Sequence, residues 1–337
     1  MNNVITEVDE EYRALRQACG LIDYEGIGRY VVTGSNAAAF LDHVVTRTAD
    51  FLLEGQISNA LLLRQDGTVV AEVLIHARGD DFLVEVWPAQ AEAAGALLSA
   101  AAAEYDDVTI TDVGEAGRVF GIEGPESFRV VEQLLPFPVA SMAYSSFATT
   151  EYEGGDVLIS RTGVTGEYGF KLHVPTAQAE HLWKELLDAG ARQVGLDALN
   201  VCRMETRFVN LERESGGSPA YPFEVGLQWM VDLNGDFVGA DAVRDAFSTS
   251  KRRPICWQAD DVAAEVPAGG ATVAAGEEAV GEVTFAVWSP TLERVIGTAQ
   301  VDEAVAASGL EFSIEDRTVR TVSAPFVVAT SFGVAME

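Results

Sequence analysis

Cysteine and histidine are scarce in this chain of 337 residues. The three cysteines and four histidines are Cys19, Cys202, Cys256, His43, His76, His173 and His181. The cysteines form neither a Cys-x-x-Cys pair nor an even framework, so we expect reduced, mostly buried thiols. No two histidines have the helical spacing of a metal centre, and no metal site is predicted.

Basic residues are also few. Lys and Arg total 22 against 52 Asp and Glu, which gives a formal net charge of −30, and lysine occurs only at positions 171, 184 and 251. Such a charge repels phosphates and offers no basic stripe, so nucleic acid is excluded as a partner. Solubility, or adaptation to high salt in which self-repulsion is screened, explains the charge more simply than an acidic binding surface.

Long apolar runs are absent as well. No stretch reaches the roughly 18 uncharged apolar residues that a membrane-spanning helix requires. Segment 1–11 is acidic and lacks the succession of basic, apolar and small residues of a secretory signal. We therefore expect a soluble, cytoplasmic protein with no membrane partner, and its length predicts two or three compact units.

Hydrophobic periodicity indicates both helices and strands. Alternation predicts an antiparallel meander of strands at 61–63, 69–76 and 81–87. Helical spacing predicts helices at 35–45, 89–104, 177–187 and 197–205. The polar run 248–254 is typical of a linker, and the β-rich tail beyond it predicts a small barrel or sandwich.

An ordered set of short motifs gives the most specific signal. Gly-Leu-Ile-Asp stands at 20–23, Arg-Thr-Gly-Val-Thr-Gly-Glu-Tyr-Gly at 161–169, Pro-Phe-Glu at 222–224 and Ser-Pro-Thr-Leu at 289–292. In this order and over nearly the whole chain, they resemble the aminomethyltransferase (glycine cleavage T-protein) family and its folate-dependent demethylase relatives. The chain lacks the Lys-Gly-Cys-Tyr-x-Gly-Gln-Glu run of the iron–sulfur assembly branch.

This resemblance implies an α+β fold, a ring of three domains of the T-protein type with a C-terminal β-barrel. The implied folate-binding domain is discontinuous, with residues 1–50 and 140–245. Residues 51–139 would form a second α+β domain and residues 250–337 the barrel.

The resemblance also implies tetrahydrofolate as cofactor. A carboxylate can accept paired hydrogen bonds from the edge of the pterin, so Glu167 is the expected partner, although without the matched run it reads as an exposed turn residue. Arg203 is expected to face the same cavity or to hold Glu167 and Glu205, its alternative being a solvated helix arginine. Tyr168 and Trp229 would supply flat walls, Trp229 being equally plausible in a core. Arg161 is the first residue of the matched run 161–169 and is assigned to cofactor binding together with that run.

The sequence departs from the family around the reacting centre. Where the family carries two adjacent acidic residues, one of them catalytic, this chain has Ala71 and Glu72, and Pro88 replaces part of a cavity-lining pair. If the first acid of the pair is catalytic, alternation along a strand turns Glu72 to the opposite face. The candidates for proton transfer, as general acid or base, are Glu72, Glu25 and Tyr221.

These departures favour methyl transfer from a small methylated donor over glycine cleavage. The latter needs an aminomethyl group delivered by a lipoyl carrier protein. Two alternatives remain: a folate-binding protein without transfer chemistry, in a regulatory or assembly role, and an enzyme on the same scaffold that uses no folate.

Overall fold

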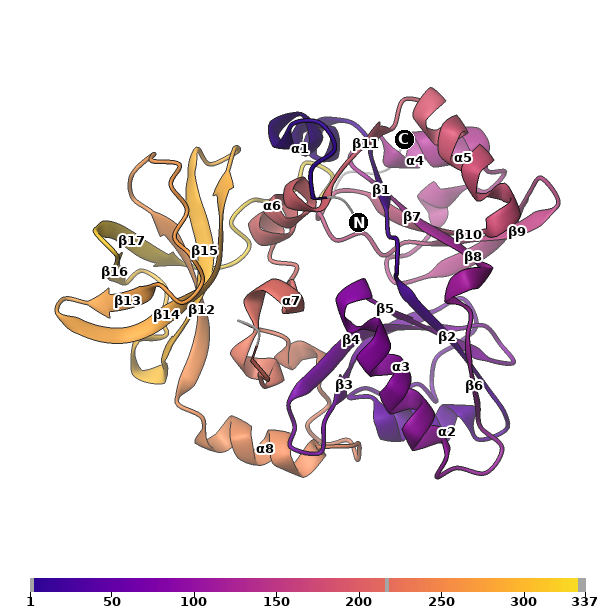
Figure 1. Cartoon of the computed structure of the whole chain (residues 1–337), viewed down its shortest axis with the longest axis horizontal. Coiled ribbons are helices and arrows are strands. Elements are labelled where there is room, and N and C mark those ends of the chain that lie inside the picture. Colours follow the sequence, from indigo (N-terminus) through magenta and orange to yellow (C-terminus); the bar gives the residue numbers. More distant parts are fainter. Residues whose placement is uncertain (1–2, 216–217, 333–337) are drawn as a thin grey trace.

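Two β-sheets and a closed barrel make up the molecule. The computed structural model describes residues 3–215 and 218–332. Figure 1 shows the barrel on one side and the two sheets, one above the other, on the opposite side, with α6 (Leu196–Thr206) and α7 (Leu211–Glu214) between them. This arrangement confirms the predicted α+β class with a C-terminal barrel. Among the described residues, no helix is long and apolar enough to cross a membrane.

The first sheet has six strands. In spatial order they are β11 (Arg192–Gln193), β1 (Gly20–Asp23), β7 (Gly117–Glu123), β10 (Gly169–Pro175), β9 (Gly155–Ser160) and β8 (Phe147–Tyr152). Its helices are α1 (Val8–Gln17), α4 (Ser127–Leu134), α5 (Thr176–Asp188) and α6. A core that includes Phe120, Phe170 and Leu182 joins α4 and α5 to one face, while α1 packs against α6.

The second sheet has five strands. In spatial order they are β3 (Ile57–Leu63), β4 (Val69–Ala77), β5 (Phe82–Val86), β2 (Gly28–Thr33) and β6 (Thr109–Asp112). The helices α2 (Ala37–Val44) and α3 (Pro88–Ala102) cover one face, above a core that includes Phe40, Ala71 and Leu98. Alanine favours the helix α3, and Pro88 starts it because the first helical turn needs no backbone N–H there.

The sheets divide the chain at other positions than the predicted domain boundaries. Strand β2 pairs with β5 and β6, so residues 28–44 belong with the second sheet rather than with the predicted unit 1–50. Strand β7 pairs with β1 and β10, so residues 117–134 belong with the first sheet rather than with 51–139. Long-range pairing decides both assignments, and no local pattern reveals it.

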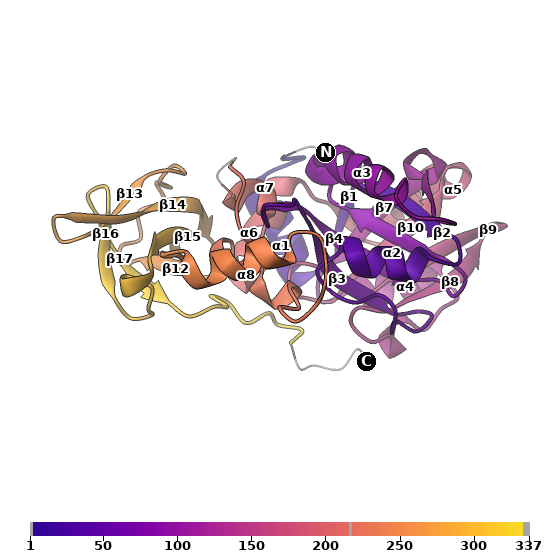
Figure 2. The same cartoon turned by 90° about the horizontal axis from the view of Figure 1, so that it is seen from below.

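The barrel follows α8 (Ala240–Thr249) and begins at Arg252, within the predicted linker. Its strands, in order around the barrel, are β12 (Arg252–Ala259), β15 (Arg294–Asp302), β14 (Glu278–Ser289), β13 (Thr272–Ala275), β16 (Glu311–Ile314) and β17 (Arg317–Val322). Trp257 is fully buried in its core. After β17 the chain runs back from the barrel toward the sheets (Figure 2), and the N–H groups of Phe326 and Val327 donate to the carbonyl of Glu205 at 2.8 and 2.9 Å.

Candidate functional site

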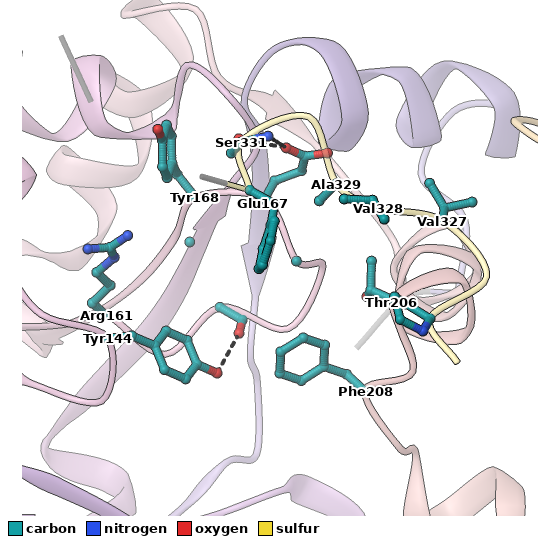
Figure 3. Close-up of a pocket in the computed structure, with 15 residues that line it drawn as sticks. Tyr144, Arg161, Glu167, Tyr168, Thr206, Phe208, Val327, Val328, Ala329 and Ser331 are labelled. Atoms are coloured by element: carbon teal, nitrogen blue, oxygen red, sulfur yellow. Dashed lines mark hydrogen bonds between the residues drawn. The ribbon is translucent and has the colours of Figure 1, made fainter. Parts of the chain in front are cut away.

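A mainly apolar cavity, here cavity A, lies between the first sheet and the returning C-terminal segment. Its volume is about 630 Å³. Tyr144, Arg161, Tyr168 and Phe208 line it on one side, and residues of the segment 325–332 line the other (Figure 3). Two of the predicted cofactor residues, Arg161 and Tyr168, therefore lie in one cavity with Glu167, as the matched run at 161–169 would require.

The carboxylate of Glu167 turns toward the C-terminal segment. It accepts a hydrogen bond from Thr330 N at 3.0 Å. Figure 3 shows the two that it accepts from Ser331, from N at 2.8 Å and from Oγ at 2.6 Å. Arg16 Nη1 lies 3.5 Å from its other face. Because a carboxylate has about four acceptor positions, these contacts leave little capacity for a ligand. The predicted pairing of Glu167 with a pterin stays a prediction and requires residues 330–331 to give way.

A buried network of charged and hydroxyl side chains contacts Glu167 through Arg16. Arg16 donates to Glu205 through Nη2 at 2.7 Å and through Nε at 3.0 Å. Glu205 also accepts from Tyr12 Oη at 2.8 Å and from Ser289 Oγ at 2.5 Å, which joins α1, α6 and the barrel. Arg16 thus takes the position between the two carboxylates that the sequence had assigned to Arg203.

A second, more polar cavity, here cavity B, has a volume of about 430 Å³ and is lined by Glu25, Trp87, Gln90 and Arg203, among others. Arg203 lies over the ring of Trp87, with 4.7 Å between the guanidinium carbon and the ring centroid. It donates to the carbonyl oxygens of Phe208, at 3.4 Å, and Val209. Arg203 and Glu25 therefore share a cavity, whereas Glu167 lines the other one.

Glu72 faces the space between the two sheets. On β4, Ala71 is fully buried in the core beneath the second sheet, so the alternation of the strand turns Glu72 away from that core. Burial raises the pKa of Glu72, although the charges of Arg203 and Lys171 oppose the rise. Among the described residues no hydrogen bond reaches its carboxylate, whereas its backbone N–H donates to Gln90 Oε1 at 2.9 Å.

The expectation that Glu72 turns to the opposite face from position 71 is thus met, but position 71 is the one that faces the hydrophobic core. A carboxylate there would be buried among apolar side chains. Of the two positions, only position 72 places a carboxylate within electrostatic reach of Arg203 and Lys171.

Lys171 and Tyr144, which lie near this space, were not singled out from the sequence. The ammonium group of Lys171 lies 4.8 Å from the ring centroid of Trp87 and 5.5 Å from that of Tyr24. The hydroxyl of Tyr144 donates to the carbonyl of Gly163 at 3.4 Å. Burial, with the charges of Glu123 and Glu72, raises the pKa of Tyr144 to about 12. The sequence could have indicated Lys171 as unusual, because this charged residue stands within the apolar strand pattern of 169–175.

Two predicted site residues lie elsewhere. Trp229, in η4 (Gln228–Met230), is 57% exposed and lines neither cavity A nor cavity B. Tyr221 precedes η3 (Pro222–Glu224) and stacks on Phe223 at 5.5 Å between ring centroids. The structure therefore does not bring them together with Glu167, Arg203 or Glu72.

Comparisons with known proteins agree with this architecture. Residues 2–235 match the family model described as GCVT N-terminal domain, and residues 252–332 match the glycine cleavage T-protein C-terminal barrel domain. The aminomethyltransferase of Geobacillus kaustophilus is 34% identical over 324 residues, which cover 94% of this chain and 88% of the relative. That of Rubrobacter xylanophilus is 31% identical over 323 residues, covering 95% and 86%.

A solved structure shows the same fold. The crystal structure of glycine cleavage system aminomethyltransferase T from Bartonella henselae matches with a TM-score of 0.86 at 21% identity, over 96% of this chain and 90% of that one. At this identity the likeness bears on the fold and not on individual site residues.

Proposed function

The chain belongs to the glycine cleavage T-protein family of aminomethyltransferases, and we propose that it transfers a one-carbon unit from a small donor to tetrahydrofolate with Glu72 managing the proton. The relatives named above are aminomethyltransferases, and the enzyme class follows from them. The identity of the donor and the role of each side chain are the parts that need testing.

The state of the Glu72 carboxylate is the observation that carries this proposal. Glu167 accepts three hydrogen bonds from the C-terminal segment. Glu123 accepts from Val164 N and Thr165 N, each at 2.9 Å, and from Thr165 Oγ at 2.7 Å. Glu72 accepts none from the described residues and has a raised pKa, which are the properties that a general acid or base requires.

Cavity A suits tetrahydrofolate in size and lining. Small-molecule sites commonly measure about 300–1,000 Å³ and combine aromatic walls with a few polar groups. Tyr144, Tyr168 and Phe208 can cover the faces of the pterin and the aminobenzoyl ring, and Arg161 offers a cation for the acidic end. Glu72 lines neither cavity A nor cavity B, but Tyr144, which lines cavity A, lies within electrostatic reach of it.

Positioning and proton transfer would account for catalysis. Tetrahydrofolate, when bound, supplies the nitrogen that receives the one-carbon unit. Glu72 would take up a proton at its carboxylate and return it to the leaving atom of the donor, and burial raises its pKa in the direction that this role requires. The residues that line the cavity would hold donor and acceptor close together.

Methyl transfer and aminomethyl transfer are the two candidate reactions. Position 71 points into the core, so Ala71 removes no carboxylate from the site, and the product decides between the two reactions. A demethylase forms methyl-tetrahydrofolate, whereas glycine cleavage with a lipoyl carrier protein forms methylene-tetrahydrofolate and ammonia. The identity of the product therefore distinguishes a reaction with a small methylated donor from a reaction with a lipoyl carrier protein.

The test compares wild-type protein with Glu72→Gln and, as matched control, Glu92→Gln at an exposed site on α3. We expect all three to bind tetrahydrofolate in calorimetric titrations. With methylated donors, Glu72→Gln should lose transfer by about a hundredfold or more while Glu92→Gln keeps it. Full turnover by Glu72→Gln would rule out its role.

Chemistry without folate is the second candidate, favoured by the saturated carboxylate of Glu167. It predicts that the wild-type protein does not bind tetrahydrofolate in either low or high salt. A non-catalytic folate-binding protein would instead bind tetrahydrofolate and form no product with any donor.

A further inference from the structure

Three potential metal ligands meet between the two sheets, outside cavities A and B. His76 comes from β4, Glu85 from β5 and His173 from β10, and all three side chains are buried. One ligand atom from each lies within 4.8 Å of the others. His173 Nε2 and Glu85 Oε2 are 2.9 Å apart. His173 is far from His76 and Glu85 in the sequence, which is why no metal site was predicted from it.

Several polar atoms of this cluster make no hydrogen bond that meets the usual geometric criteria with the residues that the structure describes. They are His76 Nε2 and His173 Nδ1, together with His173 Nε2 and Glu85 Oε2, which lie 2.9 Å apart. Buried polar atoms left without a partner destabilise the fold, so such atoms seldom gather at one place unless a water or an ion lies among them.

The surroundings orient these atoms as ligands. His76 Nδ1 lies 3.2 Å from the carbonyl oxygen of Leu83 and donates a hydrogen bond to it, which leaves the lone pair of Nε2 free toward the cluster. Lys171 binds the other oxygen of Glu85, and its ammonium group lies over the ring of Trp87.

We propose that His76, Glu85 and His173 bind a divalent transition-metal ion, with Zn²⁺ as the ion that suits them best. Two imidazoles and one carboxylate are a ligand set that Zn²⁺ takes with a fourth position open. Because His76 and Glu85 belong to the second sheet and His173 to the first, the ion would clamp the two sheets together.

A route for the ion and a limit on its affinity are also visible. His173 and Leu83 line a cavity of about 300 Å³ together with Asp156, Arg29 and Arg78, and this cavity opens beside the cluster. The ammonium group of Lys171 opposes a second cation at Glu85. The binding constant should therefore rise when Lys171 loses its charge, a result that a purely structural ion pair does not predict.

Titration of metal-stripped, untagged protein with Co²⁺ tests the site, because Co²⁺ in a tetrahedral site with nitrogen ligands absorbs visible light far more strongly than Co²⁺ bound to surface carboxylates. We expect one equivalent per chain, displaced by Zn²⁺, and an increase in melting temperature that a chelator reverses. Lys171→Gln should bind more tightly.

The variants His76→Gln and His173→Gln should each weaken binding by more than about tenfold. His181→Gln is the matched control, since His181 is exposed and lies 2.7 Å from Glu153 at a surface where unspecific binding would occur. If His76→Gln does not fold, His173→Gln and the wild-type titration decide. No absorption band in the wild-type protein, or a band that survives both substitutions, would mean that the cluster holds only water.

Discussion

At the scale of single residues, Glu72 differs from its acidic neighbours in the surroundings of its carboxylate. Glu167, Glu123 and Glu205 each accept several hydrogen bonds, and each holds parts of the fold together. Glu72 accepts none from the described residues while burial raises its pKa. A carboxyl group that accepts no hydrogen bond from its surroundings is available to a ligand, which the other three are not.

The raised pKa of Glu72 predicts a pH-dependent gain in stability for Glu72→Gln. Glu72 contributes stability at low pH, and this contribution is lost as the pH rises through its folded-state pKa. The glutamine variant should therefore melt at a higher temperature than the wild-type protein near pH 8, and the difference should shrink toward pH 5. Melting curves over this range, with Glu92→Gln as control, check the sign. A lower melting temperature for Glu72→Gln near pH 8 would contradict the argument.

Arg16, rather than Arg203, is the cation that the buried carboxylates require. The sequence motif identified Glu167 and Glu205 as residues that an arginine would hold, but α1 supplies that arginine from the other end of the chain. Spacing within a motif could not reveal this contact, because it depends on how α1 packs against α6.

Arg16→Met should therefore destabilise the fold strongly. It leaves two buried carboxylates without their cation, which costs about 3–5 kcal/mol. Arg13→Met is the matched control on the same helix, since Arg13 is exposed and should change stability by no more than about 0.5 kcal/mol. Urea denaturation of both variants measures the difference. Equal midpoints for the two would show that the network contributes nothing.

At the scale of elements, the sequence predicts strands and helices well where the periodicity is local. The meander at 61–87 became β3, β4 and β5, and the β-rich tail became the closed barrel. The assignment of β2 and β7 to their sheets could not be predicted, because each pairs with strands distant in sequence. For the same reason His76 and His173 gave no signal until two sheets brought them together.

The C-terminal segment is an element with a local function, because it closes cavity A through Glu167. Ser331→Ala removes the hydrogen bond at 2.6 Å to a buried carboxylate, and hydrogen bonds to charged groups contribute about 1.5–3 kcal/mol. We expect a loss of stability in this range from chemical denaturation. In the control Ser323→Ala, an exposed hydroxyl loses its contact at 3.1 Å with Ser308, and the change should be much smaller. If Ser331→Ala leaves the stability unchanged, the hydrogen bond from Ser331 to Glu167 does not hold the segment in place.

At the scale of the whole molecule, the main feature is the large negative net charge. A formal charge of −30 on 337 residues creates repulsion throughout the folded state. Added salt at about 1 M reduces the screening length to about 3 Å and should raise the melting temperature steadily. Scanning calorimetry in KCl from low to high concentration measures this. A melting temperature that stays constant or falls would mean that ion pairs outweigh the repulsion.

Folate binding is the property on which the account as a whole depends, and calorimetric titration with tetrahydrofolate tests it most directly. Both low and high salt are needed, because an acidic protein repels the acidic end of the ligand at low salt. We predict saturable binding with one site per chain at high salt, in wild-type protein and in Glu72→Gln alike. No binding in either buffer would contradict the account and assign the fold to chemistry without folate.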